Sequence, residues 1–234
     1  MIKNSEVTVV ITSCNRPIEL SKTLESFFKY NTYHVYSIVI IDDSGIIGCI
    51  DECIKYIPND VEKIIIYNEK NIGQIRSIDK AYSLVKTKYI FHCEDDWLFY
   101  KPGFIERSIN ILETNNKIFN VWLREYKNFV VLRNGHPISR EIINNDYRYL
   151  LSFRERTNIW SGFSFNPGLR RLSDYKLFSP YSQYIESKLC GVGGVEQALS
   201  VLYNKHGYKS TITTDEDGYV KHIGWHNSRQ NYNC

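Results

Sequence analysis

The chain lacks any long uninterrupted apolar run, and its first residues show neither the apolar stretch nor the small-residue cleavage site of a signal peptide. A helix that spans a bilayer needs about 20 consecutive, mostly apolar residues. We therefore expect a soluble, cytoplasmic protein without a transmembrane segment.

Neither positive nor negative charge is concentrated in one part of the chain. The 234 residues hold 29 Lys and Arg against 26 Asp and Glu, a formal net charge of +3, and the basic residues are scattered. Proteins that bind nucleic acid carry a basic stripe or block, so we expect no nucleic-acid partner. The six cysteines include no C-x-x-C pair, and Cys49 and Cys53 have no neighbouring His, which favours reduced structural thiols.

What the chain does have is a regular alternation of strand-like and helix-like segments. Runs rich in Val and Ile predict four strands, at residues 6–13, 35–41, 61–67 and 89–92. Apolar residues at helical spacing predict helices between them, at residues 17–30, 48–57 and 72–85. This alternation predicts an α/β fold with a doubly wound, mainly parallel sheet. The length of 234 residues predicts one large domain or one domain with an appended lobe.

A polar cluster follows each predicted strand. The four clusters lie at residues 12–16, 42–44, 71–76 and 94–96. The carboxyl ends of parallel strands meet at one edge of a sheet, where open sheets bind ligands, so we expect one nucleotide-sized site. The glycine patterns that cradle phosphates, G-x-G-x-x-G and G-x-x-x-x-G-K-[ST], are absent after the first strand. We therefore expect carboxylates and a metal ion to hold the phosphates.

The most informative cluster is Glu94-Asp95-Asp96, a run of carboxylates at the end of an apolar strand. Adjacent carboxylates repel one another unless a cation, a hydrogen-bonding sugar or protonation relieves the charge. Oxygen ligands suit hard divalent ions that bridge phosphates, so we expect Mn²⁺ or Mg²⁺ as the cofactor. For the triplet taken alone, a solvated acidic turn is the alternative.

Four segments together resemble the GT-A fold glycosyltransferases of the large inverting family, family 2. They are Val9–Pro17 with Leu20 and Thr23-Leu24, Ile41–Gly45, Asn71–Gly73 with Arg76, and Glu94–Asp96. Their order and spacing match over about the first 100 residues, and they are specific as a set. The resemblance implies a single GT-A domain with a Rossmann-like nucleotide-sugar-binding half, residues 1–100, and a mixed acceptor-binding half, residues 101–234.

The resemblance also implies roles for the polar residues. The residues that would line the nucleotide pocket are Thr12, Ser13, Asn15 and Arg16. The residues that would accept hydrogen bonds from the base or ribose are Asp43 and, behind it, Asp42. The residues that would flank the nucleotide and its diphosphate are Asn71, Gly73 and Arg76. Singly, these residues could instead end strands, cap turns or lie on a helix surface, but their common register favours a site.

The acidic triplet is similar to the family's D-x-D motif. In that motif the last carboxylate holds the metal, and the earlier ones reach the ribose or the metal's water, so Asp96 is the expected metal ligand. Glu replaces the usual first Asp, which leaves open whether Glu94 or Asp95 takes the ribose side. A late histidine completes the metal shell in many GT-A enzymes. His222 is the better match, with His226 in reserve, and an ordinary polar histidine is the alternative.

The carboxyl-terminal half is less regular. We expect a helix at 101–113, a strand at 119–123, a hairpin at 130–137 and a helix at 195–206. Residues 126–158 are expected to form a variable lobe that shapes the acceptor cleft, with a plain structural excursion as the alternative. Residues 160–168 indicate an alternating strand in which Gly162 permits a close approach. Trp160 could stack on a sugar or lie in the core.

The acceptor chemistry rests on Glu196. Similar enzymes carry an acidic residue near the start of a helix here, as the base that deprotonates the acceptor hydroxyl, and Glu196 is the only candidate in this segment. The helix dipole alone also favours a carboxylate at that position.

We therefore expect a metal-dependent hexosyltransferase that moves a sugar, with inversion, from a nucleotide-diphosphate donor to a hydroxyl of a glycan, lipid-linked or protein acceptor. A UDP-sugar is the favoured donor. A sugar-1-phosphate nucleotidyltransferase is one alternative, but its G-x-G-T-R-L-type loop is absent at residues 12–17. A noncatalytic sugar-nucleotide or glycan-binding protein is the other, and it would have lost the metal ligands or the base.

Overall fold

The computed structural model describes residues 5–125, 138–139, 141–151, 153–155, 158–186 and 194–224, with backbone only at 153–155 and 158–160. The hairpin expected at 130–137 and His226 lie outside these residues, as does the side chain of Trp160.

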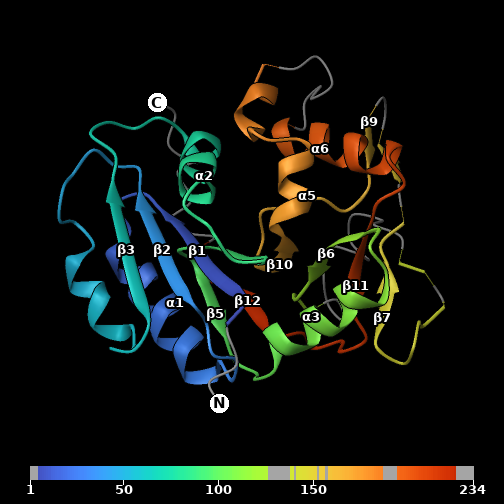
Figure 1. The fold of residues 1–234 in the computed structure, drawn as a ribbon, viewed down its shortest axis with the longest axis horizontal. Coiled ribbons are helices and arrows are strands. Elements are labelled where there is room, and N and C mark those ends of the chain that lie inside the picture. The colour runs from blue at the N-terminus through green and yellow to red at the C-terminus, as the bar shows by residue number, and fades with distance from the viewer. Residues whose placement is uncertain are drawn as a thin grey trace.

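A five-stranded sheet in the order β10-β4-β1-β2-β3 forms the centre of the molecule (Figure 1). Its strands are β1 (Val7–Ser13), β2 (Ser37–Asp42), β3 (Glu62–Tyr67), β4 (Tyr89–Glu94) and β10 (Gly168–Arg171). The first four are parallel, and β10 runs antiparallel to β4. The expected α/β fold with a mainly parallel sheet is therefore confirmed.

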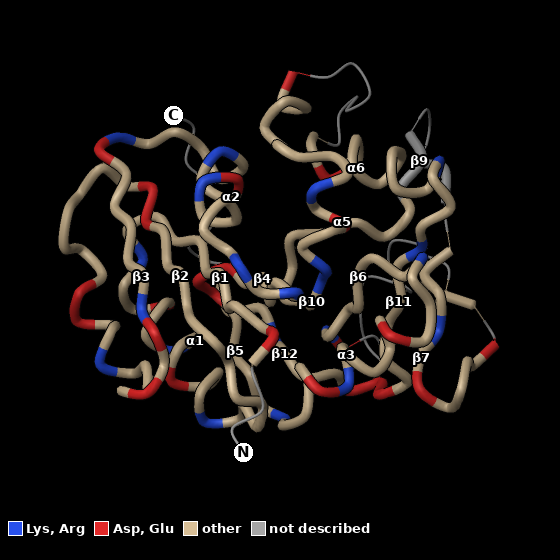
Figure 2. Tube along the Cα trace, viewed as in Figure 1, with Lys and Arg blue, Asp and Glu red and all other residues tan. Residues whose placement is uncertain are grey.

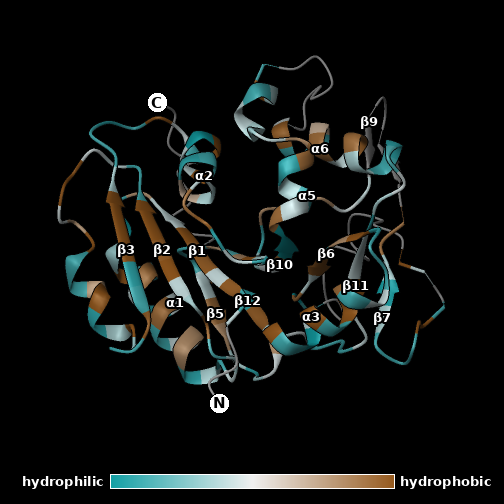
Figure 3. Cartoon of the chain, viewed as in Figure 1, coloured by the Kyte–Doolittle hydropathy of each residue, from teal (hydrophilic) through white to brown (hydrophobic). Residues whose placement is uncertain are grey.

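Helices cover both faces of this sheet. They are α1 (Pro17–Tyr30), the 3₁₀ helix η1 (Asp51–Tyr56), α2 (Gln74–Tyr82) and α3 (Phe104–Thr114). Side chains alternate between the faces of a strand, so Val9 and Ile11 of β1 pack in one core cluster with α1, η1 and α3, and Val10 packs in a second cluster with α2. Burial on both faces explains why β1 and β2 are nearly continuous apolar runs, which are brown in Figure 3.

Two expectations from the sequence need correction. The helix expected at 48–57 is a 3₁₀ helix over 51–56, because Gly48 adopts a φ of +82° and Ile57, which precedes Pro58, is extended. The strand expected at 160–168 is interrupted: β9 (Asn158–Trp160) ends before Ser161, and β10 begins at Gly168.

The break between β9 and β10 has a local cause at Gly162. Its φ is +92°, and a Cβ there would lie 2.6 Å from Cβ of Ser210. The close approach expected at Gly162 therefore occurs, and it is to a neighbouring strand of the protein.

The second half adds a three-stranded sheet in the order β6-β11-β7, flanked by α5 and α6 (Figure 1). The bounds are β6 (Ile118–Trp122), β7 (Tyr147–Tyr149), β11 (Lys209–Thr213), α5 (Leu172–Leu177) and α6 (Gly194–Lys205). Two shorter elements are β8 (Phe153–Glu155), paired with β9, and the 3₁₀ helix η2 (Tyr181–Tyr184). In Figure 1, β1–β3 lie on one side of the molecule, and α5, α6 and the second sheet lie beyond β10 on the other.

A two-stranded ribbon connects the end of the described chain to the acidic triplet. Strand β5 (Trp97–Phe99) directly follows the triplet and pairs antiparallel with β12 (Val220–His222), so that His222 lies opposite Trp97. Along the described part of the chain, no helix combines the length and the apolar character that a bilayer crossing requires.

Candidate functional site

A cavity of about 490 Å³ opens at the carboxyl ends of β1, β2 and β4. Nine of the residues singled out from the sequence line it: Thr12, Ser13, Arg16, Asp43, Asn71, Glu94, Asp95, Asp96 and His222. Pairing between neighbouring strands explains this meeting, since Thr12 lies beside Glu94 and Ser13 beside Asp42 in the sheet. The expected convergence of the polar clusters on one edge of the sheet is present.

Arg16 joins the two aspartates of the triplet. Its Nη1 donates to Oδ1 of Asp95 at 3.0 Å and to Oδ2 of Asp96 at 2.8 Å. Burial raises the pKa of Asp95, and Asp96 adds to the rise against the opposing charge of Arg16. The guanidinium thus supplies part of the positive charge that adjacent carboxylates require.

Asp96 also contacts His222. The Nε2 atom of His222 lies 3.2 Å from Oδ2 of Asp96, and the amide of Ile223 donates to the Asp96 carbonyl at 2.8 Å. Burial alone would raise the pKa of Asp96, but the hydrogen bonds and charges of His222 and Arg16 lower it below its usual value. Asp96 is therefore held as a carboxylate.

Glu94 is the third carboxylate. Its Oε1 accepts from Nε2 of Gln74 at 2.7 Å and its Oε2 from Nε1 of Trp97 at 3.2 Å. Burial, together with the charges of Asp96 and Glu196, raises the pKa of Glu94 to about 7, against those two hydrogen bonds. Its two donors fix the side chain against the wall of the cavity.

The paired aspartates at the end of β2, Asp42 and Asp43, organise the neighbouring loops. Asp42 is 1% exposed and accepts from the amide of Asn15 at 2.8 Å, where the backbone has a φ of +53°. Asp43 lines the cavity and accepts from the amides of Ile72 at 2.9 Å and Gly73 at 2.8 Å. Asp42 therefore lies behind Asp43, as expected.

The residues after β3 divide into two groups. Asn71 lines the cavity and Gly73 is bound by Asp43, whereas Arg76 is exposed on α2 and donates to the carbonyl of Ile72 at 3.3 Å. The described residues that line the cavity do not include Asn15, Asp42, Gly73 or Arg76. A direct contact of these four with a ligand stays a prediction.

Glu196 lies in the first turn of α6, as expected, and lines a second cavity of about 310 Å³. Its Oε1 accepts from the amide of Phe165 at 2.7 Å and from Oγ of Ser164 at 3.2 Å. Burial raises the pKa of Glu196, against these hydrogen bonds and the charges of Arg170 and Arg124. A raised pKa suits a carboxylate that accepts a proton near neutral pH.

The two cavities share walls. Gln74, Glu94 and Asn166 line both, so the acidic triplet and Glu196 border one connected region. A ligand in the first cavity and a second ligand beside Glu196 would therefore meet near Glu94.

Sequence reasoning missed six residues of the first cavity: Cys14, Gln74, Ser77, Trp97, Arg124 and Asn166. Arg124 carries the clearest chemistry, because its guanidinium lies 5.1 Å from the ring centre of Trp97 and interacts with the charges of Glu94 and Glu196. Burial lowers the pKa of Arg124 to about 10, which leaves it cationic. It follows β6 in an irregular segment, and no local pattern pointed to it.

Position 224 requires a glycine because its backbone lies directly against the acidic triplet. A Cβ at this position would lie 2.0 Å from Oδ2 of Asp96 and 2.6 Å from Nη2 of Arg16. The backbone after β12 therefore packs directly against the Arg16–Asp96 ion pair.

The residues present fit a divalent cation whose remaining ligands come from a phosphate and water. No group of three or more His, Cys, Asp or Glu suited to a metal occurs in the described ranges, so these residues form no all-protein cage. Asp96 and His222 nevertheless offer an oxygen and a nitrogen ligand on the cavity wall. Mg²⁺ and ions like it are commonly held by one or two carboxylates together with substrate phosphates and water.

Comparison with solved structures shows which fold this is. The chain is similar to the mannosyltransferase PcManGT from Pyrobaculum calidifontis in complex with GDP-Man and Mn²⁺ (TM-score 0.61, 10% identity, 92% of this chain and 56% of that one). It is also similar to TarS 1–349 of S. aureus (TM-score 0.62, 13% identity, 94% and 60%) and to the same protein in complex with UDP (TM-score 0.58, 14% identity, 92% and 59%). These are GT-A glycosyltransferases, so the chain has the GT-A fold.

The chain spans 56 to 60% of the length of these structures. Among curated proteins, no relative matches it. The family model described as "Glycosyl transferase family 2" matches residues 8–178, which include the acidic triplet and most of the first cavity. This chain belongs to glycosyl transferase family 2.

Proposed function

We propose that the chain is a nucleotide-sugar glycosyltransferase that transfers a hexose to a hydroxyl acceptor in a metal-dependent, inverting reaction. The observation that carries the proposal is the connection of the two cavities: one holds Asp43 and the acidic triplet, the other holds Glu196, and Glu94 lines both. Donor and acceptor can then meet at their shared wall. A volume of about 490 Å³ suits a ligand of nucleotide size.

The first half of the chain, residues 1–100, would bind the donor, and residues 101–234 would bind the acceptor. Asp43 would accept a hydrogen bond from the base or ribose, and Asn71 lies on the same wall. Arg124 and His222, from the second half, also line this cavity, so the donor site draws on both halves. We favour a UDP-sugar as the donor; one neighbour was solved with UDP and another with GDP-Man.

Asp96 and His222 would hold Mn²⁺ or Mg²⁺. When bound, such an ion acts as a Lewis acid toward the negative charge that accumulates on the departing diphosphate. Arg16, fixed by Asp95 and Asp96, and Arg124 supply further positive charge on the same wall. One structural neighbour contains Mn²⁺ together with its sugar nucleotide, which supports this choice of ion.

Glu196 would act as the general base. Both hydrogen bonds that it accepts from described residues end on Oε1, so Oε2 is the oxygen that would take the proton from the acceptor hydroxyl. The hydroxyl oxygen then attacks the anomeric carbon opposite the departing diphosphate, and the configuration inverts in one displacement. No covalent sugar–enzyme intermediate is required.

Incubation with UDP-, GDP- and dTDP-sugars, with Mn²⁺ and with acceptor or water, tests the proposal. A glycosyltransferase releases nucleoside diphosphate. Production or consumption of pyrophosphate would instead identify a nucleotidyltransferase, and binding without either product would identify a noncatalytic sugar-nucleotide-binding protein.

A further inference from the structure

Arg170 is a buried cation without a carboxylate partner. Its side chain, on β10, is 3% exposed, and it forms no ion pair with any carboxylate of the described residues. Within the described part of the chain, Nε and Nη1 have no hydrogen-bond partner, and Nη2 donates to the carbonyl of Ser164 at 3.0 Å. Figure 2 shows the basic residues of β10 in the middle of the molecule. A buried guanidinium held this way is costly unless a nearby negative charge offsets it.

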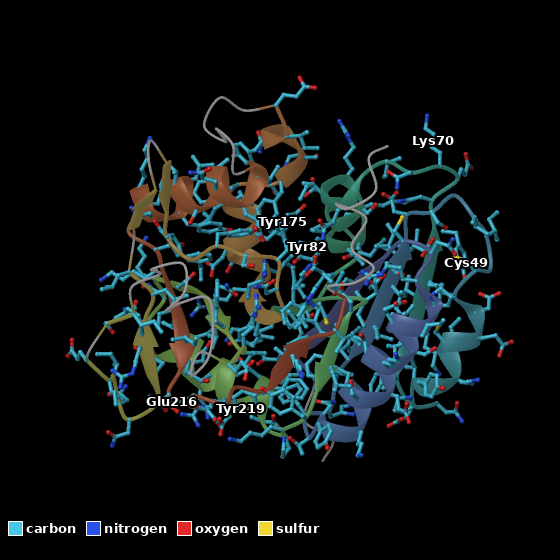
Figure 4. The ribbon with its side chains drawn as sticks, turned by 180° about the vertical axis from the view of Figure 1, so that it is seen from behind. Cys49, Lys70, Tyr82, Tyr175, Glu216 and Tyr219 are labelled. Carbon is cyan, nitrogen blue, oxygen red and sulfur yellow. The ribbon has the colours of Figure 1, made fainter. Side chains whose placement is uncertain are left out.

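Aromatic rings surround Arg170, and the carboxylates Asp79 and Asp174 act on tyrosines of the same cluster. Its guanidinium lies 5.4 Å from the ring centre of Phe163 and 5.9 Å from that of Phe165. The Tyr82 ring contacts the ring of His92, whose nitrogens find no hydrogen-bond partner among the residues that the structure describes. Tyr82 also packs edge-on against Tyr175, beside which it lies in Figure 4. Burial, with the charge of Arg170 adding to it, lowers the pKa of His92 and keeps that ring neutral.

The carboxylate that interacts with Arg170 is Glu196. A continuous set of contacts joins them: Arg170 binds the Ser164 carbonyl, and the Ser164 hydroxyl and the Phe165 amide both bind Oε1 of Glu196. Residues 163–166 belong to no helix or strand, so the guanidinium and the carboxylate both bind the same irregular segment. Arg124 and Glu94 also interact electrostatically with Glu196.

We propose that Arg170 is a positioning residue for Glu196: it fixes the segment that presents the Ser164 hydroxyl and the Phe165 amide to Oε1, and it places a buried positive charge behind that carboxylate. Only the catalytic consequence of this inference rests on the proposed function, in which Glu196 is the general base. The proposed electrostatic coupling between the two side chains does not depend on whether the chain is a glycosyltransferase.

A titration of Glu196 tests the inference without any substrate. The protein is labelled with ¹³C at glutamate side-chain carboxyls, and the Glu196 signal is identified by its loss in Glu196→Gln. Loss of the cation in Arg170→Met should move the midpoint of this signal up by about one pH unit or more. Arg170→Lys keeps the charge and should give a smaller shift.

The neighbouring Arg171 provides a matched control. It donates to the Ile118 and Asn115 carbonyls and pairs with Asp174, away from Glu196. Arg171→Lys should lower the melting temperature but leave the Glu196 midpoint unchanged. An unchanged midpoint in a folded Arg170→Met protein would overturn the inference. If Arg170→Met does not fold, the Glu196 midpoint is measured in Ser164→Ala and in Arg170→Lys instead. A midpoint equal to that of the wild type in both variants would also overturn the inference.

The kinetic consequence separates this inference from the proposed function. The panel of UDP-, GDP- and dTDP-sugars identifies the donor. With that donor, the transfer rate of the wild type should decrease at pH values below the pKa of the base. Arg170→Met should shift this decrease to higher pH. In a Glu196→Gln background, Arg170→Met should cause no further loss. Full transfer activity in Glu196→Gln would refute the base role alone, because the titration still decides the coupling.

Discussion

The Nε2 atom of His222 lies 3.2 Å from Oδ2 of Asp96. The pairing of β12 with β5 produces this contact, since it places His222 opposite Trp97, the residue next to Asp96. The lowered pKa of Asp96, caused by His222 and Arg16 against the effect of burial, keeps the carboxylate charged, as the proposed metal ligand requires.

Nucleotide and metal should bind cooperatively. Asp96 and His222 are the two metal ligands that we propose, and the described residues form no group of three or more suited to a metal, so most of the coordination shell would come from the diphosphate and water. Mn²⁺ alone should raise the melting temperature slightly, and Mn²⁺ with UDP or GDP should raise it by more than the two separate effects combined. Calorimetry measures the same coupling. Tight Mn²⁺ binding without nucleotide would contradict the two-ligand site.

Asp96→Ala should lower kcat/KM for metal-dependent turnover by about 10³-fold, because a Lewis acid supplies several kcal/mol of charge stabilisation. Substitution at a cavity wall should leave the fold intact. Asp60→Asn, at an exposed position outside the cavity, is the control and should retain full activity. Circular dichroism confirms folding, and normal turnover in folded Asp96→Ala would end the metal argument.

Gly224→Ala should damage the site through sterics alone. The added methyl group would overlap Oδ2 of Asp96 and crowd Nη2 of Arg16, so that one of them must move, at a cost of about 1–3 kcal/mol. Both stability in urea and Mn²⁺ affinity in the presence of nucleotide should fall. Gly207→Ala, which meets no atom within 4 Å but has a φ of +78°, should lower stability only.

Glu196→Gln should reduce transfer to the acceptor by about 10²- to 10⁴-fold, the usual contribution of a general base. Donor affinity should change little, because Glu196 does not line the first cavity. Comparison of kcat with the donor dissociation constant separates the two effects. Equal losses in both would reassign Glu196 to a structural role.

Stability without metal should fall as the pH rises from about 4.5 to about 7. Burial, Asp96 and Glu196 raise the pKa of Glu94 from 4.5 to about 7, so within this window the folded state binds more protons than the unfolded state. The resulting loss for Glu94 is on the order of 1–3 kcal/mol. In urea titrations, Glu94→Gln should lose less stability than wild type between pH 5 and pH 7.5. An identical loss of stability in both proteins would refute the raised pKa of Glu94.

The nucleotide-binding side of the fold could be predicted from the sequence because its signals are local. Buried strands such as β1 and β2 are continuous apolar runs, and the polar residues directly after them must meet at one edge of a parallel sheet. The short helix η1 was harder to predict, because Gly48 and Pro58 limit it to 3₁₀ geometry.

The rest of the site depends on contacts between distant segments. The expectation that Arg16 faces the nucleotide pocket did not include its ion pairs with Asp95 and Asp96, and nothing local to Arg124 indicates that it reaches the same cavity. The hydrogen bonds from Ser164 and Phe165 to Glu196 likewise join segments whose approach only the fold creates.

The most direct test of the central claim is a crystal structure of the protein with Mn²⁺ and the nucleoside diphosphate of its donor. We expect the nucleotide in the cavity beside Asp43, with the diphosphate and Mn²⁺ in contact with Asp96 and His222. Nucleotide and metal bound together elsewhere on the protein would contradict the account.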